Sequence, residues 1–175
     1  MFRRKSKEFL HLYITVDETW IHHYTPKSKQ QSAQWIPKSG SAPKRPKTQQ
    51  SAGKVLATVF WNAHGIILIN YPEKGRTITG ENYASLLDRL NDEIKKKRPH
   101  LTKKKILFYQ DIAPAHKSIK AMAKLNEFLL HPPYFPDLAP CNFYLFPNLK
   151  RWLQGKRFAP NEEVESETDA YFGGL

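Results

Sequence analysis

The chain has 175 residues, 40% of them hydrophobic and 13% aromatic, which is enough to bury the core of one domain of ordinary size. Lys and Arg number 28 against 16 Asp and Glu, a formal net charge of +12 that favours a polyanionic partner, with nucleic acid as the first candidate. The single cysteine excludes an internal disulfide and a cysteine-built zinc site, and no window approaches the roughly 18 apolar residues of a membrane span.

The N-terminal part of the chain changes from strand-like to loop-like. Residues 11–17, HLYITVD, predict a short buried strand that ends at Asp17, and residues 19–25, TWIHHYT, fit a second strand. Residues 25–53 are rich in Pro, Ser, Gln and Lys and predict a long basic excursion that cannot bury a core. Such a segment either serves a partner or remains disordered, and the sequence leaves both open.

The middle of the chain predicts an antiparallel hairpin, a helix and a further strand. Residues 54–62 and 65–71 are rich in β-branched residues and are separated by a short turn with Gly65. Thr79 is a suitable N-cap for an amphipathic helix over 79–97. Residues 104–111, KKILFYQD, predict a strand that ends in Asp111.

The C-terminal part predicts three helices and one short strand. Pro114 suits the start of a helix whose apolar face holds Ile119, Met122, Ala123 and Leu125. A brief strand follows at 127–131, then a helix with its N-cap near Cys141 or Asn142, and a final helix over 160–172. With residues 11–25 counted as one strand, the predicted order is three strands, helix, strand, helix, strand and helices, an α/β fold with antiparallel hairpins first and helical crossovers later.

Two aspartates stand where predicted strands end. In an open α/β sheet the reactive groups gather outside the carboxyl ends of parallel strands, so Asp17 and Asp111 would meet there if their strands are neighbours. Two carboxylates side by side repel unless a cation lies between them, and hard oxygen ligands suit magnesium or manganese better than zinc. A single aspartate at a strand end is more often a turn or cap residue. The pair therefore predicts a metal site only in combination with other features.

Four stretches of the sequence carry a resemblance to a known family. They are VDETWIHHYTP, GKVLATVFWNAHGIILINY, KILFYQDIAPAH and HPPYFPDLAPCNFYLFPNLKRWLQGKRF, which follow one another along the chain. Together they resemble the catalytic domain of mariner-family transposases, in a truncated copy. The resemblance implies an α/β, ribonuclease H-like (retroviral-integrase-like) fold with a mixed sheet of about five strands flanked by helices.

The resemblance also implies a single catalytic domain over 1–175, with the basic excursion at 25–53 in the place of the family's clamp loop and without the N-terminal helix-turn-helix region. It implies Mg²⁺ or Mn²⁺ as cofactor, cut-and-paste DNA transposition in the nucleus, transposon ends and target DNA as partners, and a homodimer. The residues that we expect to contact DNA are Trp20, Lys27, Lys29, Lys38, Lys44, Arg45, Lys47 and His116.

The family's three catalytic aspartates match two aspartates and one asparagine here. Asp17 and Asp111 match the first two, and Asn142 stands where the third is expected, so we expect these three residues to be the catalytic and metal-binding residues. Asparagine keeps a carbonyl oxygen but loses the negative charge, which would weaken metal binding. Ile112 also replaces a residue that is commonly Asn in the family, and the spacing from Asp111 to Asn142 is shortened.

Three functions remain open from the sequence. The first is an impaired DNA transposase or DNA-nicking domain, and the second is an inactive or domesticated remnant that binds nucleic acid without cleaving it. A ribonuclease H-like module acting on RNA is the third, because contacts to phosphates do not distinguish the sugar. The basic run at 95–98 is typical of a solvated helix end, with nuclear import as the alternative.

Overall fold

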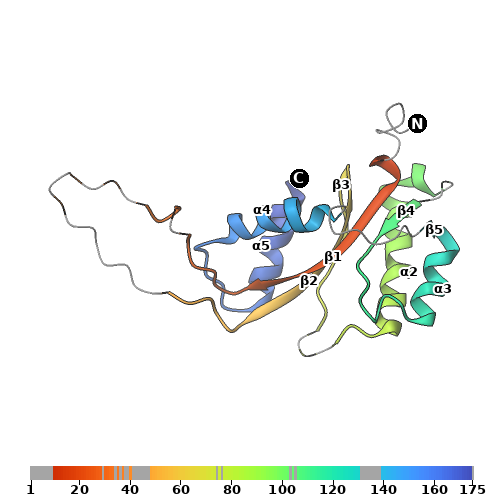
Figure 1. The fold of residues 1–175 in the computed structure, drawn as a ribbon, viewed down its shortest axis with the longest axis horizontal. Coiled ribbons are helices and arrows are strands. Elements are labelled where there is room, and N and C mark those ends of the chain that lie inside the picture. Colours follow the sequence, from red (N-terminus) through yellow and green to blue (C-terminus); the bar gives the residue numbers. More distant parts are fainter. Residues whose placement is uncertain are drawn as a thin grey trace.

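A computed structural model describes most of the chain. It covers residues 10–28, 30–33, 35, 37, 40, 48–73, 75, 77–102, 104, 106–130 and 139–174, with backbone alone for 127–130. Figure 1 shows a central sheet with α4 and α5 to one side of it and α2 and α3 to the other. In these described ranges no helix is long and apolar enough to cross a membrane.

The sheet is mixed and has five strands in the order β3-β2-β1-β4-β5. β1 pairs antiparallel with β2, which pairs antiparallel with β3, whereas β1, β4 and β5 run parallel. The hairpin predicted around Gly65 is confirmed, and this glycine has φ +106°, a conformation that side chains with a Cβ rarely adopt. The strands are β1 (Tyr13–His22), β2 (Lys54–Asn62), β3 (Gly65–Asn70), β4 (Ile106–Tyr109) and β5 (Leu129–Leu130).

The prediction that the first strand ends at Asp17 is wrong. β1 continues to His22 because its pairing with β2 continues as far as His22 and Lys54. The two strands predicted over 11–25 are therefore one, and Asp17 lies within it. What does end near Asp17 is the parallel pairing with β4, whose last pair is Thr15 with Tyr109.

Four helices flank the sheet, and their starts are only partly as predicted. Thr79 is the N-cap of α2, and its hydroxyl accepts a hydrogen bond from the Asn82 amide at 3.2 Å, as predicted. The prediction that α3 begins at Pro114 is wrong, because residues 114–118 form turns and Ile119, the first helical residue, is 90% exposed. The helices are α2 (Gly80–Lys97), α3 (Ile119–Phe128), α4 (Phe146–Leu153) and α5 (Asn161–Gly173).

The described residues also include two short helical turns next to α2 and α4. One is a 3₁₀ turn at Pro99–Leu101, directly after α2. The other is a π-helical turn at Cys141–Leu145 that leads into α4, with Pro140 as its N-cap. The predicted N-cap at Cys141 or Asn142 is therefore wrong by one or two residues, and Asn142 lies inside the π turn. Such turns are rare and often occur at functional sites.

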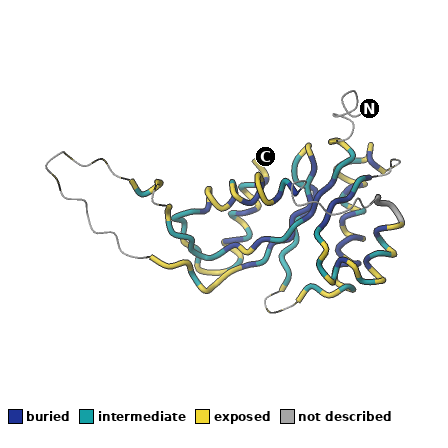
Figure 2. The backbone as a smooth tube through the Cα atoms, viewed as in Figure 1, coloured by how far each residue is buried: buried dark blue, intermediate teal, exposed yellow. Residues whose placement is uncertain are grey.

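Alternating residues of the strands build two cores, one on each face of the sheet. Ile14, Val16 and Phe60 pack with α2 and α3, whereas Ala57 and Val59 pack with the π turn, α4 and α5. This alternation follows from the two-residue period of a strand. Figure 2 shows the buried segments concentrated along the sheet and on the helix sides that face it. The sheet is thus covered on both faces, and its functional edge is formed by strand ends.

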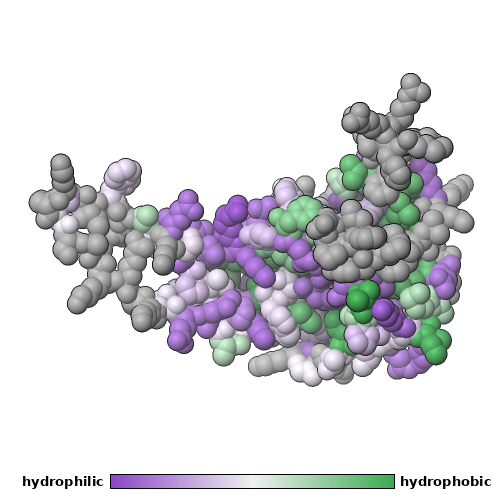
Figure 3. Space-filling view, viewed as in Figure 1, coloured by the Kyte–Doolittle hydropathy of each residue, from purple (hydrophilic) through white to green (hydrophobic). Residues whose placement is uncertain are grey.

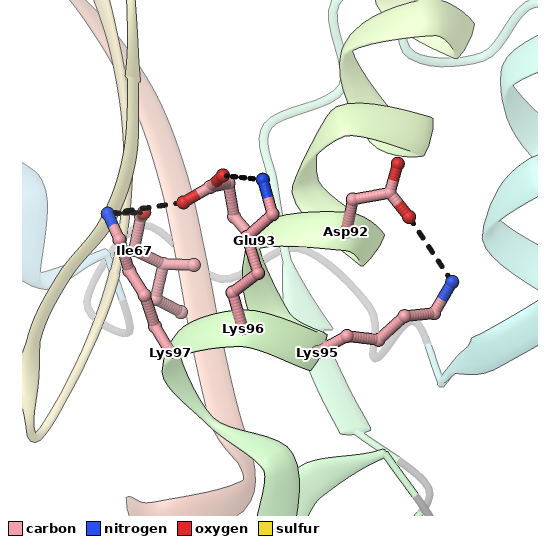
Figure 4. Close-up of polar contacts among 6 residues, drawn as sticks. All are labelled: Ile67, Asp92, Glu93, Lys95, Lys96 and Lys97. Carbon is pink, nitrogen blue, oxygen red and sulfur yellow. Dashed lines mark hydrogen bonds and ion pairs between the residues drawn. The ribbon is translucent and has the colours of Figure 1, made fainter.

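The basic run at 95–98 forms the last turn of α2 and its C-cap. Figure 4 shows Lys95 and Lys96 in ion pairs with Asp92 and Glu93, at 3.2 and 3.1 Å. Lys97 crosses to β3, where its ammonium donates to the Ile67 carbonyl at 2.7 Å. These contacts match the first of the two predicted roles, a helix end stabilised by its positive charges.

Candidate active site at the ends of β1 and β4

Asp17 within β1 and Asp111 just after β4 lie at equivalent places beside two neighbouring parallel strands. The described pairing of β1 and β4 ends at Thr15 and Tyr109, and each aspartate lies two residues beyond its paired residue. The Asp17 carboxylate accepts from the Glu18 amide at 2.8 Å, and the Asp111 carboxylate accepts from the Ala113 amide at 3.0 Å. The sheet order therefore brings the two predicted carboxylates to one edge.

Asn142 reaches the same edge from the π turn. Cys141 anchors this turn, because its buried thiol accepts from the Trp61 indole N–H at 3.0 Å and lies 3.9 Å from the Thr15 hydroxyl. Thr15 and Asp17 are two residues apart, so their side chains point to the same face of β1. On that face Asn142 lies near enough to the Asp17 carboxylate to lower its pKa.

The two carboxylates have opposite electrostatic environments. Burial raises the pKa of Asp17 above its ordinary value, and the negative charges of Glu18 and Asp111 raise it further, against the lowering effect of hydrogen bonds from the Glu18 amide and Asn142. The contact with His116 lowers the pKa of Asp111 below its ordinary value, against the opposing effect of burial. Asp111 is thus held ionised, whereas Asp17 ionises less readily without a cation nearby.

His116 lies behind this edge and is only 2% exposed. Its Nδ1 lies 2.6 Å from Asp111 Oδ1, and its Nε2 lies 3.4 Å from Glu18 Oε1. Burial lowers the pKa of His116, but the two carboxylates outweigh burial and raise it to about 9. The predicted contact between His116 and DNA does not fit this buried position, because both ring nitrogens face carboxylates inside the protein.

The three residues form a donor set that fits a hard divalent cation. Two carboxylates, of which Asp111 disfavours the ionisation of Asp17, and one carboxamide supply only oxygen donors, which suit Mg²⁺ or Mn²⁺. In the part of the chain that the structure describes, no three His, Cys, Asp or Glu side chains form a cluster able to hold a metal ion. The third donor of this set is consequently the neutral Asn142.

The predicted DNA-contacting residues are distributed around this site or fall outside the described ranges. Trp20 is 47% exposed on β1, with the Lys54 ammonium 4.2 Å from its ring centroid, and Lys27 is exposed beyond the end of the strand. The remaining predicted residues lie outside the described part of the chain; they are Lys29, Lys38, Lys44, Arg45 and Lys47.

Several residues around the site were not predicted from the sequence. Glu18 contacts His116, and Tyr83 packs under the His116 ring with a centroid distance of 4.1 Å. Glu18 could have been predicted to belong to the site from its position directly after Asp17. Nothing in the periodicity of α2 distinguished Tyr83 from a core residue. A cavity of about 470 Å³ also begins at Glu18; its lining includes Trp20, Gln50, Lys150 and Gln154.

Comparison with known sequences finds one family and two well-matched relatives. A family model described as "Transposase (partial DDE domain)" matches residues 25–104. The human "Histone-lysine N-methyltransferase SETMAR" is 35% identical over 190 residues, which cover 100% of this chain and 27% of the relative. The "Mariner Mos1 transposase" of Drosophila mauritiana is 31% identical over 176 residues, which cover 97% of this chain and 50% of the relative. The chain thus spans half or less of the length of these relatives.

Comparison with solved structures gives matches over almost the whole chain. The "Mos1 mariner paired end complex with Mn" has a TM-score of 0.84 at 29% identity, covering 99% of this chain and 51% of that chain. The "catalytic domain of Mos1 mariner transposase" has a TM-score of 0.72 at 27% identity, covering 99% and 75%. These matches confirm the predicted α/β, ribonuclease H-like fold.

Proposed function

Because the chain is a mariner transposase-like catalytic domain, we propose that it binds DNA and cleaves phosphodiester bonds, with strand transfer, at the edge formed by Asp17, Asp111 and Asn142. The convergence of these three side chains from β1, β4 and the π turn is the observation that carries the proposal. The Mos1 structures titled as complexes with Mn and with Mg support the choice of cation.

Each residue has a separate task in this proposal. Asp17 and Asp111 would bind Mg²⁺ or Mn²⁺ through their carboxylates, and Asn142 would add a neutral oxygen. A cation bound there supplies activation of a water molecule and stabilisation of the leaving oxygen. His116 keeps Asp111 deprotonated, and Asn142 orients the carboxylate of Asp17.

We propose further that Asn142 impairs cleavage more than DNA binding. A carboxamide brings no negative charge to offset a divalent cation, so metal binding weakens, whereas phosphate contacts by Lys and Arg do not depend on this position. Ile112 is a second departure beside the site, because it exposes 55% of an apolar side chain next to Asp111.

The proposed partners are transposon ends and target DNA, bound by a homodimer in the nucleus. One matching structure is titled as a Mos1 paired-end complex with the left transposon end, and the net charge of +12 here suits a polyanion. A second candidate function is DNA binding without cleavage, as in an inactive or domesticated remnant. The neutral Asn142 and the exposed Ile112 are the observations that favour it.

Cleavage of a plasmid and of a pre-nicked transposon-end duplex in Mn²⁺ distinguishes these functions. We expect Asn142→Asp to raise the cleavage rate about 10- to 100-fold, the range that weakened or misplaced metal-site groups cost, and Asp111→Ala to abolish cleavage. Asn148→Asp is the matched control, because it adds the same charge on α4, where Asn148 contacts Arg151 at 3.2 Å.

The result decides between the two candidates. Equal activity of the wild-type protein and Asp111→Ala would show that any cleavage does not come from this site. If all variants are inactive but still bind duplex DNA, the chain is a DNA-binding protein without catalytic function.

A further inference from the structure

We propose that His116 is a positioning residue that joins β1 to the segment after β4, beyond the last pair of these two strands, and thereby sets the relative placement of Asp17 and Asp111. The proposal rests on the proposed metal-dependent function of this edge. It assigns to His116 a role inside the protein, in place of contact with DNA.

The need for such a link follows from the sheet itself. Described pairing between β1 and β4 stops at Thr15 and Tyr109, so the aspartates lie beyond the last backbone pair of these strands. A side chain that contacts both strands beyond this point can hold them at a fixed separation, as a further backbone hydrogen bond would. His116 supplies this link, because its two ring nitrogens face Glu18 of β1 and Asp111 after β4.

The two acidic neighbours on β1 point to opposite faces of the sheet. Asp17 shares a face with Thr15, so Glu18, the next residue, points to the other face, where it meets His116. Pairing with β2 holds β1 here on one side, and the contact of Glu18 with His116 adds a link toward Asp111 that leaves the face of Asp17 unoccupied.

The segment that carries His116 is folded back on Asp111. The Asp111 carboxylate accepts from the Ala113 amide at 3.0 Å, and the Ala113 carbonyl accepts from the His116 amide at 3.0 Å. The imidazole then returns to the same carboxylate at 2.6 Å. Glu18, His116 and Asp111 together form a bridge between β1 and the segment after β4. Among the described residues, His116 Nδ1 and Glu18 Oε1 are buried with no well-aligned hydrogen-bond partner, so each of these atoms depends on its contact within this bridge.

Tyr83 of α2 fixes the plane of the imidazole from below. Its ring centroid lies 4.1 Å from that of His116 at an interplanar angle of 32°, and Tyr83 is fully buried in the core under α2. Its hydroxyl donates to Gln110 Oε1 at 2.5 Å, which ties it to the residue before Asp111. Tyr83 thus connects the bridge to the hydrophobic core. Groups that orient metal-binding carboxylates typically change metal affinity about 10- to 100-fold when they are removed.

The test is Mn²⁺ affinity, measured by the electron paramagnetic resonance of free Mn²⁺ or by calorimetry. His116→Phe keeps a ring over Tyr83 but removes both nitrogens, and we expect it to weaken Mn²⁺ binding about 10- to 100-fold. His116→Asn can still donate to Asp111, so we expect partial rescue. His23→Phe is the control, because His23 contacts Asn161 at 2.9 Å away from the site.

A second variant keeps the inference testable if His116→Phe fails to fold. Glu18→Ala removes the other end of the bridge, and combining it with His116→Phe should weaken Mn²⁺ binding no more than His116→Phe alone, since both changes break one link. Wild-type Mn²⁺ affinity in both single variants would overturn the inference and leave the proposed function standing. Failure of the wild-type protein to bind Mn²⁺ would overturn both.

Discussion

Asp111 and His116 show how one contact determines two protonation states. The imidazole lowers the pKa of Asp111 and the carboxylates raise that of His116 to about 9, although burial acts against both shifts. At neutral pH the two side chains therefore form an ion pair between a buried imidazole and a carboxylate that is 39% exposed, in which loss of the carboxylate leaves the buried imidazolium without this partner. Asp17 has no such partner charge, and this difference separates the two carboxylates of the site.

The raised pKa of His116 predicts a loss of stability at alkaline pH. The stabilising effect of the protonated imidazole is complete below the ordinary histidine value of 6.5 and is lost as the pH rises through about 9. The difference in free energy of unfolding between wild type and His116→Phe, measured in urea, should therefore shrink from pH 6 to pH 10. The shift of Asp111 acts only in acid, below this window. A difference that stays constant over this range would contradict the assignment.

At the scale of secondary structure, local signals and tertiary packing decide different features. Thr79 and Gly65 act within a few residues of chain, and their predicted roles as N-cap and turn residue are confirmed. The end of β1 depends on its pairing with β2, and the start of α3 depends on the turns after Asp111. Both positions were predicted wrongly. The π turn at Asn142 is likewise held by contacts of Cys141 with distant residues.

The N-cap of α2 gives a prediction at this scale. Thr79→Ala should lower the free energy of unfolding by about 1 kcal/mol, because the amide of Asn82 loses its hydrogen-bond acceptor. Thr79→Ser keeps the hydroxyl and should stay close to wild type. Urea denaturation followed by circular dichroism measures both, and equal loss in the two variants would show that the methyl group of Thr79 matters more than the cap.

At the scale of the whole molecule, the net charge of +12 favours a polyanion as partner. Figure 3 shows hydrophilic side chains gathered around α4 and the adjoining ends of β1 and β2. The cavity beside Glu18 lies in this region, with Lys150 and Trp20 in its lining. Lys150 in this lining would attract phosphates toward the site, as the proposed function requires.

DNA binding should therefore depend strongly on salt. Each phosphate neutralised by Lys or Arg contributes about 0.9 to the slope of log affinity against log salt concentration. Replacing Lys27 or Lys150 by Gln should reduce this slope by about 1 each, as measured by fluorescence anisotropy on duplex DNA. Lys95→Gln is the control, since Lys95 pairs with Asp92 at 3.2 Å. An affinity that does not change with salt would contradict phosphate contacts.

The sequence by itself determined the order of elements, the hairpin at Gly65, the cap at Thr79 and the resemblance to mariner transposases, because these depend on local periodicity, backbone preferences and short motifs. It also singled out Asp17, Asp111 and Asn142. Only the tertiary structure decided that these residues meet, that Glu18 belongs to the site and that His116 is buried between two carboxylates. The physical reason is that such contacts join residues far apart in the chain, and they exist only once the sheet order has placed β1 beside β4.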